Sequence, residues 1–344
     1  MKIGILTGGG DCPGLNPVIR GVVRKSIQLG HEMIGIKYGW KGIVENIFEP
    51  LNEQSVSGIL HRGGTILKSS RTNVFKIENG EKIVMDNMKK AGMDALVAIG
   101  GEDTLGVAAK LYTLGVNVVG VPKTIDNDLS ATDYTFGFDT SVNIVMEAID
   151  RLHSTAESHN RVIVVEVMGR HAGWIAVHGG MAGGADYILI PEKTFTYEEI
   201  TESLKKRHAR GKDFSIVVVA EGAKIISGTK EEEILQDQEL DSFGHVKLGG
   251  IGARLAKEIE KRTGFETRDV VLGHLQRGGS PTAFDRVLGS RLGVFAAELV
   301  DSGNFGKMAA LQGTKIVAAD LQEAVGTLKT VDMDLYDVST TFFG

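Results

Sequence analysis

The feature that most constrains the fold is a series of short, β-branched apolar runs separated by polar stretches with helical spacing. The runs lie at residues 2–7, 95–99, 116–121, 161–167, 214–220 and 268–272. Because they are almost continuously apolar, we expect strands buried on both faces of parallel sheets. Between them, apolar residues recur at helical spacing over 15–23 and 142–149. This pattern predicts an α/β protein with mostly parallel sheets flanked by helices.

Charge and cysteine content narrow the class of partner and the compartment. The chain has 344 residues, with 38 basic and 44 acidic side chains and a net charge of -6. This balance gives no general positive field, so we expect neither nucleic acid nor a membrane as a partner. The single cysteine, Cys12, cannot form an internal disulfide, and no long apolar stretch or cleavable signal opens the chain. A cytoplasmic protein is expected.

Two of the expected strands are followed by a glycine cluster and an acidic residue. The first loop, residues 8–14, brings backbone amides close enough to bind an anion at the start of a helix, although such turns are common and this one matches neither the Walker nor the dinucleotide motif. The second, residues 100–104, contains Glu102 and Asp103, whose carboxylates suit Mg²⁺ that also carries phosphate. Capping of a helix by Asp103 or Thr104 is the alternative.

The third loop, residues 122–128, contains a cation and two carboxylates directly after a strand. Lys123 is a candidate electrophilic stabiliser and Asp126 is a candidate general base. Turn formation alone accounts for aspartate and asparagine here, but less readily for the whole set. The third loop therefore favours chemistry over a purely structural turn.

Candidate phosphate ligands follow the later strands. Arg170, in the loop 168–174, can bind phosphate oxygens through two parallel hydrogen bonds, although it could also be an ordinary surface arginine. Glu221 ends another strand, and Arg268 leads to the segment 274–280, in which His274 and Arg277 stand three apart before a glycine pair. This segment suits the binding of a sugar phosphate.

With these loops assembled, the sequence resembles the phosphofructokinase family over nearly its whole length, from the Gly-Gly-Asp loop at 9–11 to the Gly-His-Leu-Gln-Arg-Gly-Gly-Ser segment at 273–280. The resemblance implies a two-domain fold with the active site in the cleft between the domains. Residues 1–137 with about 276–306 would bind the phosphoryl donor, and residues 138–275 with about 307–344 would bind fructose 6-phosphate.

The resemblance also implies roles for individual residues. Asp126 matches the family's proton acceptor, Lys123 and Arg170 would stabilise the transition state, and the cofactor would be Mg²⁺, held by Glu102 with Asp128 as a second candidate. The donor would be bound by Gly10, Arg71, Gly101 and Thr104. The sugar phosphate would be bound by Thr124, Asp126, Arg161, Met168, Gly169, Arg170, Glu221, Arg268, His274 and Arg277. Arg161 and Arg268 match arginines that reach in from a neighbouring subunit, which implies a homodimer or homotetramer.

Two positions divide the family by phosphoryl donor, and this chain has Asp103 and Lys123 there. Members that use ATP typically have glycine at both positions. The pair of aspartate and lysine is instead the pattern of members that use pyrophosphate. A carboxylate at Asp103 would oppose the α-phosphate of ATP by bulk and charge. The expected reaction is the reversible transfer of a phosphoryl group from pyrophosphate to the 1-hydroxyl of fructose 6-phosphate, in glycolysis or gluconeogenesis.

Three alternatives remain open at this point. An ATP-dependent 6-phosphofructokinase would require Asp103 to turn away. A noncatalytic module that binds a sugar phosphate or a nucleotide is the rival from another class, since a fold does not fix a function. A dinucleotide oxidoreductase is the third alternative, but the first loop lacks the glycine motif that such enzymes use to bind the cofactor.

Two further features have no assigned role. Residues 222–250 form a polar insertion. Arg20 and Arg24 match positions that some members use for an allosteric effector, but they could equally be solvated on a helix.

Overall fold

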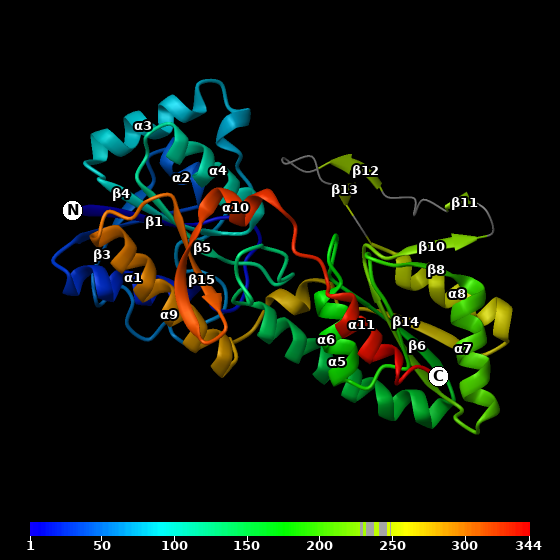
Figure 1. Ribbon diagram of the computed structural model, residues 1–344. Coiled ribbons are helices and arrows are strands. Elements are labelled where there is room, and N and C mark those ends of the chain that lie inside the picture. The colour runs from blue at the N-terminus through cyan, green and yellow to red at the C-terminus, as the bar shows by residue number, and fades with distance from the viewer. Residues whose placement is uncertain (228–229, 232–236, 241–245, 248) are drawn as a thin grey trace. The chain divides into compact units, whose positions relative to one another are not determined.

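The chain folds into two compact units, each made of two segments of sequence. The computed structural model describes residues 1–227, 230–231, 237–240, 246–247 and 249–344 (Figure 1). The first unit contains Met1–Thr140 and Arg277–Leu328, and the second contains Ser141–Gln276 and Lys329–Gly344. Both are built from helices and mostly parallel sheet, which confirms the predicted α/β class.

A seven-stranded sheet is the centre of the first unit, with the strand order β16-β15-β5-β4-β1-β2-β3. The strands are β1 (Lys2–Thr7), β2 (Glu32–Ile36), β3 (Phe48–Leu51), β4 (Ala95–Gly100), β5 (Val118–Pro122), β15 (Lys307–Gln312) and β16 (Lys315–Asp320). The five inner strands are parallel, and the edge strands β3 and β16 pair antiparallel. Since β1, β4 and β5 are parallel neighbours, their carboxyl ends meet at one edge of the sheet, where ligands of such sheets gather.

Helices cover both faces of this sheet. They are α1 (Leu15–Gln28), α2 (Trp40–Val44), α3 (Gly80–Ala91), α4 (Glu102–Thr113), α9 (Ala283–Asp301) and α10 (Leu321–Gly326), with the 3₁₀ turn η1 (Val74–Lys76). α1 and α9 cover one face, and α3, α4 and α10 cover the other (Figure 1). Apolar side chains of alternate strand positions, among them Leu6, Leu96 and Met308, form the core beneath the second group of helices.

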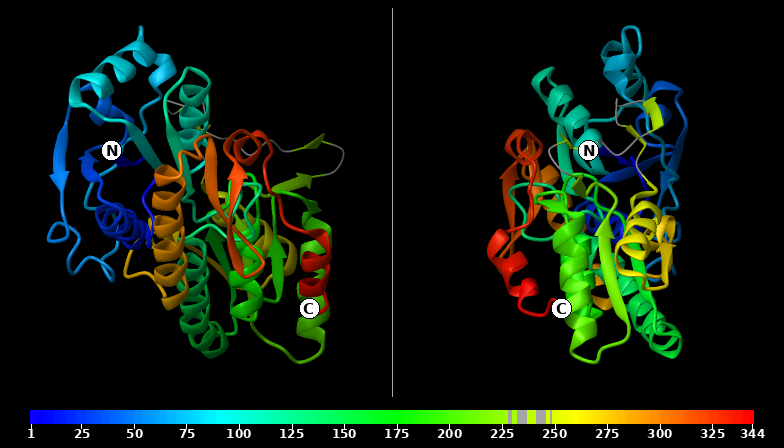
Figure 2. Two further views of the ribbon diagram at one scale, coloured as in Figure 1. Left: turned by 60° about the vertical axis from the view of Figure 1, so that its left-hand side comes forward. Right: turned by 90° about the vertical axis from the view of Figure 1, so that its right-hand side faces the viewer.

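α1 and α9 lie directly against each other (Figure 2). A Cβ atom at Gly21 would lie 2.8 Å from the carbonyl oxygen of Ser290, and one at Gly293 would overlap the carbonyl oxygen of Val18. The two helix backbones therefore touch where both helices have glycine, and a side chain at either position would force them apart.

The second unit contains a four-stranded parallel sheet with the order β14-β6-β9-β7. Its strands are β6 (Val162–Val167), β7 (Tyr187–Leu189), β9 (Ser215–Ala220) and β14 (Thr267–Val271), and smaller sheets are formed by β8 (Thr194–Thr196), β10 (Lys224–Ser227), β11 (Lys230–Glu231), β12 (Asp237–Leu240) and β13 (Val246–Lys247). The helices are α5 (Phe138–His159), α6 (Trp174–Ala182), α7 (Tyr197–Ala209), α8 (Ile251–Thr263) and α11 (Met333–Thr340), with the 3₁₀ turn η2 (Gly273–Arg277).

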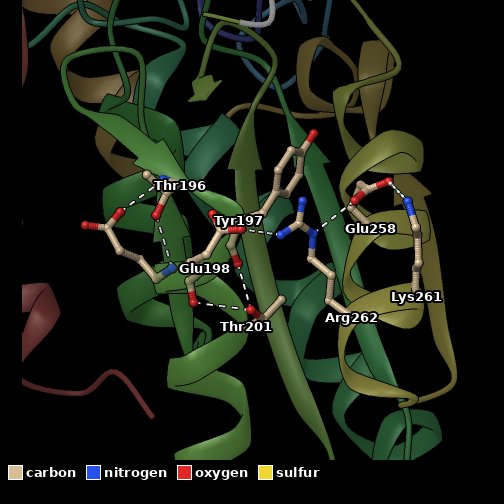
Figure 3. Close-up of polar contacts among 8 residues, drawn as sticks. Thr196, Tyr197, Glu198, Thr201, Glu258, Lys261 and Arg262 are labelled. Carbon is tan, nitrogen blue, oxygen red and sulfur yellow. Dashed lines mark hydrogen bonds and ion pairs between the residues drawn. The ribbon is translucent and has the colours of Figure 1, made fainter. Parts of the chain in front are cut away.

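Charged side chains join α7 to α8 on the surface of this unit (Figure 3). Arg262 donates to Glu258 at 3.0 Å, pairs with Glu198, and lies 4.9 Å from the ring centroid of Tyr197. Hydrogen bonds from Arg262 hold the pKa of Glu258 below its usual range. Because these groups are largely solvated, the cluster fixes how the two helices pair more than it stabilises the fold.

All six predicted strands are confirmed as β1, β4, β5, β6, β9 and β14, with ends that differ by at most two residues. The course of the last segment differs from the prediction that residues 307–344 accompany 138–275. The segment from Lys307 to Leu328 belongs to the first unit, because β15 pairs with β5 and β16 pairs with β15.

The predicted 222–250 insertion follows β9 and precedes α8, but residues 228–229, 232–236, 241–245 and 248 lie outside the described residues. Within the part of the chain that is described, no helix has the length and apolar character needed to cross a bilayer.

The close approach of α1 and α9 makes a stability prediction. Gly293→Ala should lower the free energy of unfolding by about 2 kcal/mol, because the added methyl group overlaps the backbone of α1. Gly106→Ala in α4 is the matched control, since no atom lies within 4 Å of its Cβ position; the gain in helix propensity should stabilise the protein by about 1 kcal/mol. Urea unfolding followed by circular dichroism measures both. Equal effects of the two substitutions would show that the helices separate freely.

Candidate active site

The first two glycine loops are packed together by one threonine. Gly8, which follows β1, donates its N–H to the carbonyl oxygen of Ile99 in β4 at 2.9 Å. Thr104 is 2% exposed, and its side chain fills the space where Gly8 and Gly100 lack a Cβ; at Gly8 that atom would lie 2.5 Å from Thr104 Oγ1. Both glycines are therefore required by the Thr104 side chain, which holds the ends of β1 and β4 at a fixed separation. The N-cap residue of α4 is Gly101, so neither Asp103 nor Thr104 is the N-cap residue.

Lys123 connects the third loop to the first. Its side chain is 4% exposed, and Nζ donates to the carbonyl oxygen of Gly10 at 2.5 Å. Burial lowers the pKa of Lys123, and the charge of Arg277 lowers it further, while the nearby carboxylates of Asp126 and Asp128 oppose this shift. The structure thus brings the predicted stabiliser to the loop that is predicted to bind the donor.

The loop that contains Asp126 is held by a set of hydrogen bonds of its own. Asp126 donates its N–H to Thr124 Oγ1 at 3.1 Å. Asn127 has a left-handed backbone with φ of 52°, which asparagine tolerates better than most residues, and its Oδ1 accepts from the N–H of Thr135 at 3.0 Å. Thr135 Oγ1 in turn donates to the carbonyl oxygen of Thr124 at 2.7 Å. The carboxylate of Asp126 is therefore presented on a loop whose backbone is fixed on both sides.

Three carboxylates lie near one another at this edge of the sheet. Burial raises the pKa of Asp128 to about 7; the negative charge of Asp126, and more weakly that of Glu102, acts in the same direction. Among the described residues, no three histidine, cysteine or acidic side chains form a ready metal cage. Mg²⁺ usually needs only one or two carboxylates when it also binds phosphate. Glu102 and Asp128 therefore suit a metal that arrives with a phosphorylated ligand.

Further residues contact the first loop from distant parts of the first unit. Ser70 accepts the N–H of Gly9 through its carbonyl oxygen at 3.1 Å, and the hydroxyl of Ser69 donates to the carbonyl oxygen of Gly9 at 2.5 Å. Arg71 follows them and is exposed. Arg277 Nη1 donates to the carbonyl oxygen of Asp11 at 3.3 Å, so this arginine lies on the first loop. Sequence reasoning missed the two serines, whose only signal is a polar pair before Arg71.

Cys12 lies at the base of the first loop. Its thiol is buried and donates to the carbonyl oxygen of Phe136 at 3.6 Å. Burial raises the pKa of Cys12 to about 12, so the thiolate that reacts with electrophiles is not populated at neutral pH. Cys12 therefore packs as a structural residue at the base of the loop.

In the second unit, Met168 and Glu221 follow the neighbouring strands β6 and β9, whose ends are in register at Val167 and Ala220. The N–H of Met168 donates to Gln276 Oε1 at 3.2 Å, and the N–H of Gly222 donates to the carbonyl oxygen of Gly169 at 3.1 Å. Gly169 needs to be glycine because its φ is 136°.

Arg170, the next residue of this loop, is partly buried and makes no hydrogen bond or ion pair with any residue that the structure describes. A guanidinium can bind an anion through two parallel hydrogen bonds, so Arg170 stays a candidate phosphate ligand.

Arg161 and Arg268 lie at the opposite end of this sheet. Arg161 directly precedes β6, and its Nη2 lies 2.7 Å from Glu266 Oε1, while Nη2 of Arg268 donates to the same oxygen at 2.6 Å. These contacts hold the pKa of Glu266 below its usual range. Because β6 rises by about 3.3 Å per residue, roughly 20 Å of strand separates Arg161 from Met168.

The predicted site residues thus fall into three groups, each described within its own unit. The first unit brings together the residues of the glycine and lysine loops, and the second unit has one group at each end of its sheet. In order, the groups are Gly10, Arg71, Gly101, Glu102, Asp103, Thr104, Lys123, Thr124, Asp126, Asp128 and Arg277; Met168, Gly169, Arg170 and Glu221, with His274 exposed two residues beyond Leu272; and Arg161 with Arg268.

Comparison with known proteins identifies the class to which this fold and these loops belong. The family model described as phosphofructokinase matches residues 2–300. The chain belongs to the phosphofructokinase family.

Individual relatives differ in the donor that they are named for. The chain is 58% identical to a pyrophosphate--fructose 6-phosphate 1-phosphotransferase of Streptomyces coelicolor, with all of both chains covered. It is 51% identical to ATP-dependent 6-phosphofructokinase 3 of the same organism over 96% of each chain. Among solved structures, pyrophosphate-dependent phosphofructokinase from Marinobacter aquaeolei has the same fold, with a TM-score of 0.83 and 22% identity over 97% of this chain and 86% of that one.

The environment of Asp128 predicts how stability depends on pH. Its pKa is about 7 in the folded protein, above that of an ordinary aspartate, so folding favours the protonated form. This contribution to stability is lost as the pH rises through about 7 and is recovered on acidification toward about pH 4. Asp128→Asn should therefore stabilise the metal-free protein by roughly 4 kcal/mol near pH 8 and by progressively less at lower pH. Urea unfolding in the presence of a chelator tests this; a difference that does not change with pH would contradict it.

Proposed function

We propose that this chain catalyses the reversible, Mg²⁺-dependent transfer of a phosphoryl group from pyrophosphate to the 1-hydroxyl of fructose 6-phosphate. The products are fructose 1,6-bisphosphate and phosphate, and the reaction serves glycolysis or gluconeogenesis. The observation that carries the proposal is the hydrogen bond from Lys123 to Gly10, which places an ammonium group, the Asp126 loop and the first glycine loop together. The 58% identical relative named for this reaction supports it.

Asp126 acts as the general base. Its backbone is fixed by Thr124 Oγ1, and its side chain remains partly exposed, so its carboxylate can accept the proton of the 1-hydroxyl as that oxygen attacks phosphorus. A noncatalytic binding module would have little use for a base beside a buried lysine and further carboxylates. The presence of these groups together therefore favours an enzyme over a binding module.

Lys123 stabilises the negative charge of the transferring group. An ammonium has three N–H donors, of which one is used by the carbonyl oxygen of Gly10, so two can bind phosphate oxygens. Phosphoryl transfer depends mainly on alignment and on charge neutralisation, and a buried ammonium supplies both. When bound, Mg²⁺ would supply further neutralisation, and Glu102 and Asp128 are the residues that would hold it.

Asp103 selects the donor. It lies in the first turn of α4, beside Glu102 and above the glycine pair at the end of β4. The carboxylate of Asp103 would repel the α-phosphate of ATP, whereas pyrophosphate ends before that point. The donor is then held by Gly10, Arg71, Gly101 and Thr104, with Thr104 acting from beneath the glycines.

The proposed ligands of fructose 6-phosphate are those named from the sequence. Thr124 and Asp126 contact the sugar, Met168, Gly169, Glu221 and His274 line its position, and Arg170 with Arg277 binds its negative charge. Arg161 and Arg268 lie some 20 Å of strand away from Met168, so they serve another copy of the chain, in a homodimer or homotetramer. The substrates and the buried Cys12, which forms no disulfide, fit the cytoplasm.

The first experiment compares pyrophosphate with ATP. We expect fructose 1,6-bisphosphate to form from fructose 6-phosphate and Mg²⁺ with pyrophosphate and not with ATP. In Asp103→Gly, kcat/KM for ATP should rise by at least about tenfold while that for pyrophosphate falls, because the opposing carboxylate is gone. Activity of the unaltered chain with ATP alone would refute the role of Asp103 and keep the family, and activity with neither donor would refute the proposed reaction.

A second variant tests the proton acceptor. Asp126→Asn should lower kcat by about 10²–10⁴-fold, with a much smaller effect on KM for fructose 6-phosphate, because the amide cannot take the proton. Asp86→Asn, on the exposed side of α3 in an ion pair with Lys82, is the matched control and should keep full activity. Steady-state rates with pyrophosphate measure both, and normal turnover in Asp126→Asn would disprove the mechanism.

A further inference from the structure

The carboxylate of Glu192 joins two segments of the second unit that are far apart in sequence. Its Oε1 accepts the N–H of Gly173 at 3.0 Å and the N–H of Val331 at 2.8 Å, and its Oε2 also accepts the N–H of Gly173 at 3.1 Å. Hydrogen bonds from backbone N–H groups to an ionised carboxylate are stronger than those to a neutral acceptor. Glu192 thus ties the C-terminal segment, residues 329–344, to Gly173, the residue just before α6.

Gly173 is the last residue before α6 and ends the loop that contains Arg170. A Cβ atom at Gly173 would overlap Ile190 and would lie 3.0 Å from Glu192 Oε2, so only glycine fits against this carboxylate. The loop is therefore fixed at three points: Met168 by Gln276, Gly169 by Gly222, and Gly173 by Glu192. Arg170 lies between the second and third of these points.

The C-terminal segment is itself held firmly against α6 and β7. Trp174, the first residue of α6, donates its indole N–H to the carbonyl oxygen of Lys329 at 3.0 Å, and Lys329 Nζ lies 5.4 Å from the centroid of the same ring. Val331 is 4% exposed, and Tyr336, which is 1% exposed, donates its hydroxyl to the carbonyl oxygen of Ile188 at 3.0 Å. Glu192 therefore connects the Arg170 loop to a packed element rather than to a free tail.

We propose that Glu192 is a positioning residue for sugar-phosphate binding, which acts by holding the C-terminal segment against the end of the Arg170 loop. This inference rests on the proposed function of that loop. A guanidinium binds phosphate well only when its plane is aligned with two oxygens. Fixing Gly173 restricts the backbone three residues after Arg170, so the guanidinium is already aligned before the sugar phosphate binds, which lowers the entropic cost of binding.

The alternative is that Glu192 only stabilises the fold. The two readings differ in which kinetic constant changes. All contacts of Glu192 described above lie within the second unit, whereas Lys123, Asp103 and the glycine loops belong to the first. A positioning role thus predicts a change in KM for fructose 6-phosphate with little change in KM for pyrophosphate, whereas a loss of folded protein would lower kcat without selecting one substrate.

The test uses Glu192→Gln in the full-length chain. The amide puts an NH₂ group against the N–H of Gly173 in place of Oε2, so that contact is lost. Because the negative charge is also removed, the hydrogen bonds from Gly173 and Val331 to the remaining oxygen become weaker. We expect KM for fructose 6-phosphate to rise by at least about tenfold, with kcat and KM for pyrophosphate within about twofold. Hydrogen exchange at the amides of Gly173 and Val331 should become faster.

Glu199→Gln is the matched control. Glu199 Oε2 also accepts a backbone N–H, that of Thr196 at 3.0 Å, in the same unit but at the start of α7 and away from the Arg170 loop. This variant should leave both KM values unchanged. If Glu192→Gln does not fold, Trp174→Phe replaces it. Phenylalanine keeps an aromatic ring but loses the indole N–H that donates to the carbonyl oxygen of Lys329. KM for fructose 6-phosphate should then rise by about threefold or more.

The outcomes separate this inference from the proposed function. An unaltered chain that makes no fructose 1,6-bisphosphate refutes the proposed reaction and, with it, the role of Glu192 in binding this sugar phosphate. An active chain in which Glu192→Gln, or its replacement variant, leaves KM for fructose 6-phosphate unchanged overturns the inference alone. Equal increases in KM for both substrates, or the same effects in Glu199→Gln, also overturn it.

Discussion

The contact on which the candidate site depends is the one between the ends of β1 and β4. Gly8 donates to Ile99, and the Thr104 side chain fills the space left by Gly8 and Gly100, so the two glycine loops cannot move independently. Lys123, at the end of the next parallel strand, then reaches the carbonyl oxygen of Gly10. Strand order, two missing side chains and one buried ammonium are together sufficient to place the proposed donor site beside the proposed base.

The parts of the fold that could be predicted are those with a strong local pattern. Strands β1, β4, β5, β6, β9 and β14 are apolar and bounded by turn residues, so sequence alone located them. The position of β15 could not be found in this way, because its place is set by parallel pairing with β5, at Lys307 with Val119 and Met308 with Gly120, across nearly 190 residues of sequence. That distant pairing is why the prediction for residues 307–328 differs from the structure, whereas residues 329–344 lie in the second unit as predicted.

The same distinction applies to the site. Residues directly after strands, such as Asp103, Lys123 and Asp126, could be named because the carboxyl ends of parallel strands are where ligands gather. Ser69 and Glu192 could not, because each acts through a hydrogen bond to a backbone group of a distant loop, and such a bond leaves no motif in the sequence. Gln276 lies within the predicted segment 273–280, but its bond to the N–H of Met168 could not be read from that segment. The cleft between the domains and the subunit count stay predictions.

The shared contact of Arg161 and Arg268 with Glu266 has a consequence for how a phosphate would be received. Both guanidiniums already have an anionic partner, so a phosphate that reached them would replace a carboxylate rather than water alone. Binding at this end of the sheet would then be an exchange of one anion for another. Glu266 offsets the repulsion between the two guanidiniums, and it would be the group released if a phosphate took its place.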